Sequence, residues 1–209
     1  MGGSVSWGKG CNCLHLQIYR DSKDRCKNAS TKSSLSLDGF LAIESGFTLD
    51  KESNTIAIVC RDLIVVLAFD TREVLIQWQV KIKAHLSEVQ QFLVQITNLP
   101  PKSKLSTGPA RLHLQDYTFC LVSAIPPRLL GFWPINELRR FGIIDGKFCF
   151  EGGSGCGKDR LGVGAHVLHT NQCEELAKCF ELALNGKLHG KRRLSTNKNS
   201  CKRRDSMQH

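Results

Sequence analysis

The order of short strand-like runs and longer helix-like runs most constrains the fold of this chain of 209 residues. Between residues 11 and 69, short apolar or alternating runs are separated by turn signals such as Asp38-Gly39, which is typical of antiparallel strands. From residue 70 to residue 86 apolar side chains recur every three or four positions, which predicts a helix. Asp70 followed by Glu73 resembles a capping box at the start of that helix.

The same order then repeats in a second unit. About seven short strands are predicted between residues 89 and 169, and residues 171–186 have the apolar period of a helix, with Asn171 as the predicted N-cap. A sheet and an amphipathic helix must each bury one apolar face, so each group of strands should pack against the helix that follows it. The sequence thus predicts a mainly β protein of two consecutive antiparallel sandwiches or barrels, each closed by a C-terminal helix.

The net charge of +10 is unevenly placed along the chain. From residue 187 onward there are eight Lys or Arg against one acid, so this tail carries +7 and residues 1–186 carry only +3. A nucleic-acid-binding protein concentrates positive charge on its folded surface, so this distribution argues against a nucleic-acid partner. The tail has few apolar residues, and we expect it to be disordered and able to contact anionic lipid.

The remaining composition narrows the class of protein further. No run of about 18 apolar residues is present and the first residues lack the apolar core of a secretory signal, so a cytoplasmic protein is expected. The ten cysteines form no C-x-x-C pair, which favours free thiols. His166, His169 and Cys173 are close in sequence, but no fourth ligand accompanies them, so no metal site is predicted.

The glycine-rich stretch from Gly152 to Lys158 reads G-x-x-x-x-G-K, the spacing of a loop that binds nucleotide phosphates. Such a loop needs Ser or Thr after the lysine to hold magnesium, and a helix whose first amides face the phosphates. Here Asp159 follows the lysine, and Gly162 and Gly164 are poor helix residues. We therefore predict a connection between two antiparallel strands at this place, and expect neither an enzyme nor a bound cofactor.

Several motifs of the second unit occur in a recognisable order: "GPARLHL", "IPP", "FWPINELRRFG", "FCFEGGSGCG" and the closing helix. In sequence and spacing they resemble the phosphotyrosine-binding (PTB) domain of the insulin-receptor-substrate and downstream-of-kinase adaptor family. The first unit, with "TIAIVC" and a Trp in its helix, resembles the later part of a pleckstrin-homology (PH) domain. The resemblance implies a partial PH-like domain at residues 1–88, a PTB domain at 89–186 and a basic tail at 187–209.

The PH resemblance begins near Cys13, inside what would be the third strand of such a domain. Residues 1–10 are not expected to supply the two strands before it, so the first domain is expected to be N-terminally incomplete. The resemblance also implies phosphoinositide binding and pairing into a homodimer through PH domains. The sequence begins M-G-x-x-x-S, an acceptor pattern for myristoylation at Gly2. One acyl chain needs a second membrane signal, which the basic tail could supply at the inner face of the plasma membrane.

The resemblance implies a non-catalytic signalling adaptor that docks on tyrosine-phosphorylated Asn-Pro-x-Tyr motifs in the cytoplasmic segment of a receptor tyrosine kinase. In this family the peptide adds as a strand along "ELRRFG" and lies against the closing helix. Four apolar residues are therefore expected either to shape the peptide groove or to belong to the core: Leu138, Phe141, Leu176 and Phe180.

The resemblance assigns the phosphate to Arg139, because the planar guanidinium donates two parallel hydrogen bonds to phosphate oxygens. Neighbouring strand residues point to opposite faces, so Arg139 and Arg140 are not expected to face the same site, and Arg140 should meet solvent or an acid. The second phosphate-binding arginine of the family is replaced by Ser154-Gly155, which leaves Lys158 or Arg160 as substitutes. A scaffold that binds unphosphorylated peptides, or lipid alone, stays open as the alternative.

Overall fold

A computed structural model of the chain describes residues 2–7, 14–19, 23, 33–85, 89–101, 103, 105–154, 156 and 163–188. This part of the chain is mainly β, and all its strand pairs are antiparallel, which confirms the predicted fold class. Of the helices in this part, none has the length and apolar character needed to cross a bilayer.

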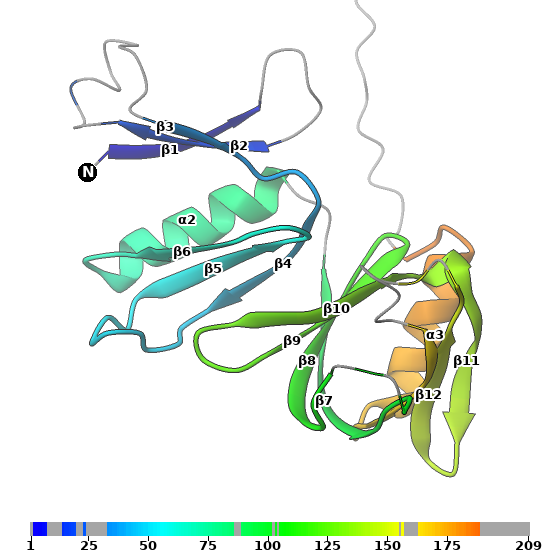
Figure 1. The fold of residues 1–209 in the computed structure, drawn as a ribbon. Coiled ribbons are helices and arrows are strands. Elements are labelled where there is room, and N and C mark those ends of the chain that lie inside the picture. Colours follow the sequence, from blue (N-terminus) through cyan, green and yellow to red (C-terminus); the bar gives the residue numbers. More distant parts are fainter. Residues whose placement is uncertain are drawn as a thin grey trace, which may run out of the picture.

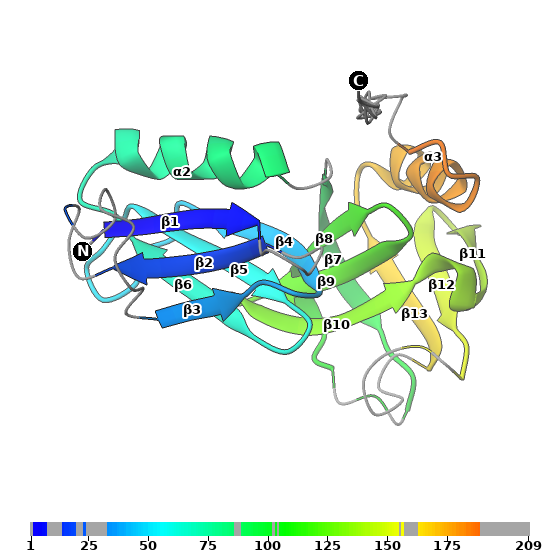
Figure 2. The ribbon, with the colours of Figure 1, turned by 90° about the horizontal axis from the view of Figure 1, so that it is seen from above.

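The first unit consists, within the described residues, of two three-stranded sheets in the orders β1-β2-β3 and β4-β5-β6. The strands are β1 (Gly2–Trp7), β2 (Leu14–Tyr19), β3 (Ser33–Ser36), β4 (Phe40–Ser45), β5 (Thr55–Cys60) and β6 (Ile64–Ala68). Helix α2 (Arg72–His85) runs along one open side of the two sheets (Figures 1 and 2). Its buried Leu75 and Ile82 pack against Ile56 and Ile58 of β5, so the helix closes the core of this unit.

Two details of the first unit bear on the expectations. The expectation that residues 1–10 do not supply two strands is compatible with the structure, in which the described residues of this stretch, Gly2–Trp7, form one strand, β1, that pairs with β2, with Gly2 opposite Tyr19. The stretch is rich in Gly and Ser and has weak strand propensity, so it is the pairing with β2 that defines the strand. The helix cap also lies one residue later than predicted: Thr71 Oγ1 accepts a hydrogen bond from the Val74 amide at 3.4 Å.

The second unit is built on a seven-stranded sheet in the order β10-β9-β8-β7-β13-β12-β11. Its elements are β7 (Gln90–Asn98), β8 (Gly108–Gln115), β9 (Thr118–Ser123), β10 (Arg128–Pro134), the short 3-10 helix η1 (Ile135–Glu137), β11 (Leu138–Ile144), β12 (Lys147–Gly152), β13 (Gly164–His169) and α3 (Cys173–Leu184). The sheet curves, and α3 lies beside β11 and β12 (Figure 1). The helix thereby covers the apolar interior at the end of the sheet that carries β11.

The core of the second unit is a cluster of aromatic rings around Phe119. Its ring stacks on Trp133 at 5.2 Å between centroids, and meets Phe150 at 5.0 Å and Phe180 of α3 at 4.8 Å. Aromatic pairs at such distances contribute beyond their buried area, so these contacts hold α3 on the sheet. The predicted N-cap at Asn171 is wrong: α3 begins after Gln172, whose side chain makes no capping hydrogen bond.

The two units pack against each other through β4, which contacts β8 and β9. Side chains from both units form a shared apolar cluster of Leu41, Ala42, Val59, Cys120 and Val122. Beside it the buried carboxylate of Glu44 on β4 lies between two residues of β8. Its Oε1 is 2.7 Å from His113 Nε2, and its Oε2 accepts a hydrogen bond from Arg111 Nη1. The contact between the units is therefore both apolar and ionic.

Candidate functional site

Strand β11 is an edge of the seven-stranded sheet, because within the described residues it pairs only with β12. The two strands are joined by Asp145 and Gly146, whose φ angles of 49° and 70° fit a type I′ turn. This turn sets the register of the hairpin and places Arg140 opposite Glu151. The outer edge of β11 presents main-chain N–H and C=O groups with which another extended segment can pair.

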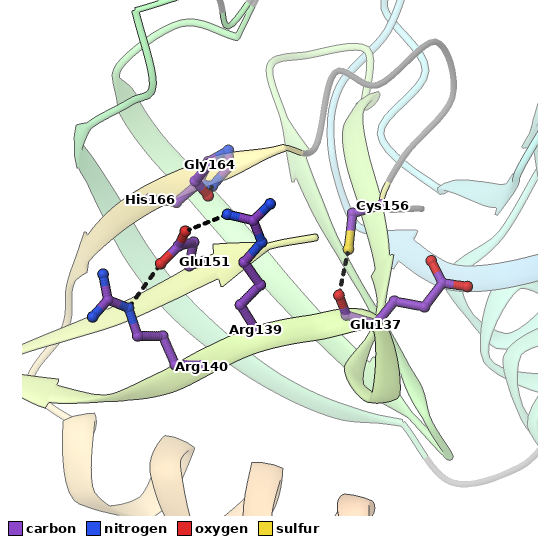
Figure 3. A network of polar contacts seen from close by, with 7 residues as sticks. All are labelled: Glu137, Arg139, Arg140, Glu151, Cys156, Gly164 and His166. Atoms are coloured by element: carbon purple, nitrogen blue, oxygen red, sulfur yellow. Dashed lines mark hydrogen bonds and ion pairs between the residues drawn. The ribbon is translucent and has the colours of Figure 1, made fainter. Parts of the chain in front are cut away.

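A register shift interrupts the pairing of β11 with β12 near its start. Leu138 lies opposite Gly152 and Arg140 lies opposite Glu151, so Arg139 is an extra residue on its strand, as in a β-bulge. Arg139 Nη1 lies 3.2 Å from Glu151 Oε1, and Arg140 Nε lies 2.7 Å from Glu151 Oε2 (Figure 3). The expectation that alternation keeps the two arginines from one site is therefore wrong, because the bulge cancels the alternation at this point.

The three charged side chains differ in how far they are exposed to solvent. The side chains of Arg139 and Arg140 are 62% and 81% exposed, whereas that of Glu151 is 18% exposed. The hydrogen bond from Arg140, reinforced by Arg139, holds the pKa of Glu151 below its usual value of 4.5, so the carboxylate is ionised at neutral pH. The cluster has a net charge of +1, and its two guanidiniums are open to an anion from solution.

The glycine-rich segment after β12 fixes the chain just before Arg139. The Gly153 amide donates to the Glu137 carbonyl at 3.1 Å, and the Cys156 thiol donates to the same oxygen at 3.4 Å. A Cβ at position 153 would lie 2.5 Å from that oxygen and 3.9 Å from Arg139 Cγ, so only glycine fits here. The segment connects β12 to the antiparallel β13, as predicted in place of a nucleotide loop.

The candidate substitutes for the missing second arginine, Lys158 and Arg160, lie outside the described residues. Ser154, one of the two residues that stand where the family has that arginine, lies in an exposed turn. Within the described residues, the cationic groups that the structure brings together at the start of β11 are therefore Arg139 and Arg140.

The apolar candidates divide into two kinds. Leu138 and Phe141 of β11 are partly exposed and pack on the core, with the Phe141 ring 5.4 Å from the Phe180 ring. Leu176 and Phe180 of α3 are fully buried, so they belong to the core that supports β11, the second of the two alternatives. A partly exposed residue of α3 that sequence reasoning missed, Ala177, packs on the same cluster.

Of the loosely clustered His166, His169 and Cys173, His166 lies in the core of the second unit, His169 is exposed and Cys173 is partly exposed. Within the described residues, no group of three His, Cys, Asp or Glu side chains is placed to hold a metal ion. His166 is fully buried, stacks on the Phe150 ring at 4.6 Å between centroids, and lies with Nδ1 2.9 Å from the Gly164 carbonyl oxygen. Burial lowers the pKa of His166 below its usual value of 6.5, so its ring is neutral in the folded protein at neutral pH.

Glu151 is the functional candidate that sequence reasoning missed. A signal for it was present in the sequence. Asp145-Gly146 forms a two-residue turn between β11 and β12, and such a turn fixes which residues of the two strands face each other. Counting back from the turn pairs Arg140 with Glu151, an opposite-charge pair across two strands. The participation of Arg139 could not be counted in this way, because it depends on the bulge.

Comparison with known proteins adds an independent observation. No protein-family model matches the chain. Over 175 residues, which are 84% of the chain, it is 34% identical to protein Dok-7 of Homo sapiens, 33% identical to that of Mus musculus and 31% identical to that of Takifugu rubripes. The chain spans about a third of the length of these curated relatives, since the match covers 34% of each. The family resemblance predicted from the motifs is confirmed, and the chain is a relative of Dok-7 of the downstream-of-kinase family.

Proposed function

We propose that this chain is the peptide-docking part of a signalling adaptor, in which the free edge of β11 receives an extended peptide and Arg139, together with Arg140, binds a phosphate on it. The observation that carries the proposal is an edge strand that begins with two exposed guanidiniums gathered at one place. Main-chain hydrogen bonds to the edge supply affinity independent of sequence, and the side chains beside it supply selectivity.

The chemistry of the start of β11 favours a phosphorylated ligand. Each guanidinium has five N–H donors in a planar fork, and both side chains are largely exposed, so together they can donate to several oxygens of one phosphate. A phosphotyrosine is long enough to bring its phosphate to side chains beside the strand, and Leu138 and Phe141 offer apolar contacts to the rest of the peptide. We accordingly propose a tyrosine-phosphorylated Asn-Pro-x-Tyr motif as the ligand.

The partner follows from the family resemblance. We propose the cytoplasmic segment of a receptor tyrosine kinase, and the first peptide to test is that of the muscle-specific receptor kinase of the neuromuscular junction. Docking would then take place in the cytoplasm at the inner face of the plasma membrane. The basic tail (187–209) and an acyl chain on Gly2 would add two weak membrane contacts, and pairing through the first unit would make a homodimer.

The experiment is a fluorescence anisotropy titration of an Asn-Pro-x-Tyr peptide, with and without phosphate, into the wild type and Arg139→Ala. A charge-assisted hydrogen bond contributes about 1.5–3 kcal/mol, so Arg139→Ala should weaken phosphopeptide binding roughly tenfold and leave the unphosphorylated peptide unchanged. Arg128→Ala, on the exposed start of the opposite edge strand β10, is the matched control and should bind as the wild type.

Three other results would contradict the proposal. Equal binding of both peptides to the wild type would indicate a phosphate-independent scaffold. Binding to anionic vesicles without binding of either peptide would indicate a lipid-binding protein. An equal loss in Arg139→Ala and Arg128→Ala would show that general positive charge, and not the site on β11, holds the phosphate.

A further inference from the structure

The carboxylate of Glu151 is bound in the manner expected of a phosphate at this site. One of its oxygens lies 3.2 Å from Arg139 Nη1 and the other lies 2.7 Å from Arg140 Nε, so a single anionic group bridges both guanidiniums (Figure 3). Among the residues drawn in Figure 3, the other carboxylate, that of Glu137, points away from both arginines. The proposed phosphate site is thus occupied by an anion that belongs to the protein itself.

Glu151 is better fixed than the arginines that it holds. It lies on β12, a strand paired on both sides, with Arg140 opposite on β11 and Ala165 opposite on β13. Its side chain is mostly buried, whereas both guanidiniums are largely exposed. A carboxylate tethered in this way has an effective concentration at the arginines of millimolar order or higher. A free ligand at micromolar concentration must compete against it.

We infer that Glu151 is a specificity-determining residue that competes internally for the phosphate site and sets which anions the site accepts; this inference rests on the proposed function. If a carboxylate on an incoming peptide displaced Glu151, the arginines would bind the same kind of group as before. The peptide would therefore gain no binding free energy from that contact. A phosphate on tyrosine has a charge between −1.5 and −2 near neutral pH and three acceptor oxygens, so it displaces Glu151. The protein therefore discriminates phosphotyrosine from acidic side chains, at some loss of affinity for phosphotyrosine.

The test uses three fluorescent peptides that differ only at the last position of Asn-Pro-x-Tyr: phosphotyrosine, glutamate and phenylalanine. They are titrated at pH 7.5 into the full chain, into Glu151→Gln, which keeps the side-chain shape, and into Glu137→Gln. The last variant removes an equal charge from the neighbourhood without touching either guanidinium, so it controls for long-range electrostatics.

In the wild type the glutamate and phenylalanine peptides should bind equally, and the phosphotyrosine peptide more tightly. Exposed ion pairs are weak, so releasing the arginines in Glu151→Gln should tighten phosphotyrosine binding by about two- to fivefold. The glutamate peptide should gain a similar factor over the phenylalanine peptide, whose own affinity should stay constant and thereby shows that the variant is folded. Glu137→Gln should behave as the wild type.

The results separate this inference from the proposed function. If the wild type prefers phosphotyrosine but Glu151→Gln binds it no more tightly, the inference about Glu151 is overturned and the proposed function stands. If the wild type shows no phosphate preference but Glu151→Gln acquires one, phosphate docking by the wild type is refuted and the competition by Glu151 is supported. No preference in either protein would overturn both. If Glu151→Gln does not fold, Glu151→Thr, whose branched side chain suits a strand, makes the same test.

Discussion

Neutralising Glu44 tests how strongly the two units are joined. The Glu44 side chain is 3% exposed and meets His113, which is 2% exposed, and Arg111, which is 42% exposed. Glu44→Gln preserves the shape of the side chain but removes the charge that both β8 residues contact. Breaking a buried ion pair by removing one partner destabilises a protein by about 3–5 kcal/mol, because the other charge, here that of Arg111, is left uncompensated. Because water can solvate the half-exposed Arg111, we expect a smaller loss, about 2–3 kcal/mol in the free energy of unfolding.

The assay is urea denaturation at pH 7.5, followed by tryptophan fluorescence and circular dichroism. Glu52→Gln is the matched control, because it removes the same charge from an exposed position of the first unit and should change stability by less than about 0.5 kcal/mol. A double-mutant cycle of Glu44→Gln with His113→Gln should give a coupling above about 0.5 kcal/mol, since the two side chains are in contact. A Glu44→Gln variant as stable as Glu52→Gln, or a cycle without coupling, would refute the reasoning.

Two further predictions concern the site and the core of the second unit. Gly153→Ala should lower the free energy of unfolding by about 1–3 kcal/mol and weaken phosphopeptide binding, because its Cβ would press on the Glu137 carbonyl before Arg139. Thermal melting measures the first effect and fluorescence anisotropy the second, with Ser154→Ala as the control. Values for Gly153→Ala equal to those of Ser154→Ala would contradict this reasoning. The unfolded chain protonates His166 near pH 6.5 while the folded protein resists it, so the stability of the wild type should fall as pH drops below 6.5 towards the lower folded pKa. His166→Phe should flatten that slope between pH 7.5 and 5.5, and parallel curves for both proteins would argue against a neutral buried ring.

The bulge that unites the two arginines shows where sequence reasoning stopped. The Asp145-Gly146 turn was enough to pair Arg140 with Glu151, because a two-residue turn fixes the register of its own hairpin. The position of Arg139 depends instead on how the segment before β11 is held by the Gly153 amide, which comes from beyond the far end of the hairpin. Alternation along a single strand cannot contain that information.

Apart from β1, which depends on its pairing with β2, the sequence by itself determined most of the elements and their order, because strand alternation, helix period and turn chemistry are local properties of the chain. It also carried the family motifs of the second unit. Tertiary structure alone decided the ionic contact of Glu44 with residues 67 and 69 positions away, and the burial of Phe180 beneath Phe141. It likewise decided that Arg139 and Arg140 share one carboxylate. Each of these depends on contacts between distant segments, which exist only once the sheets and helices have packed together.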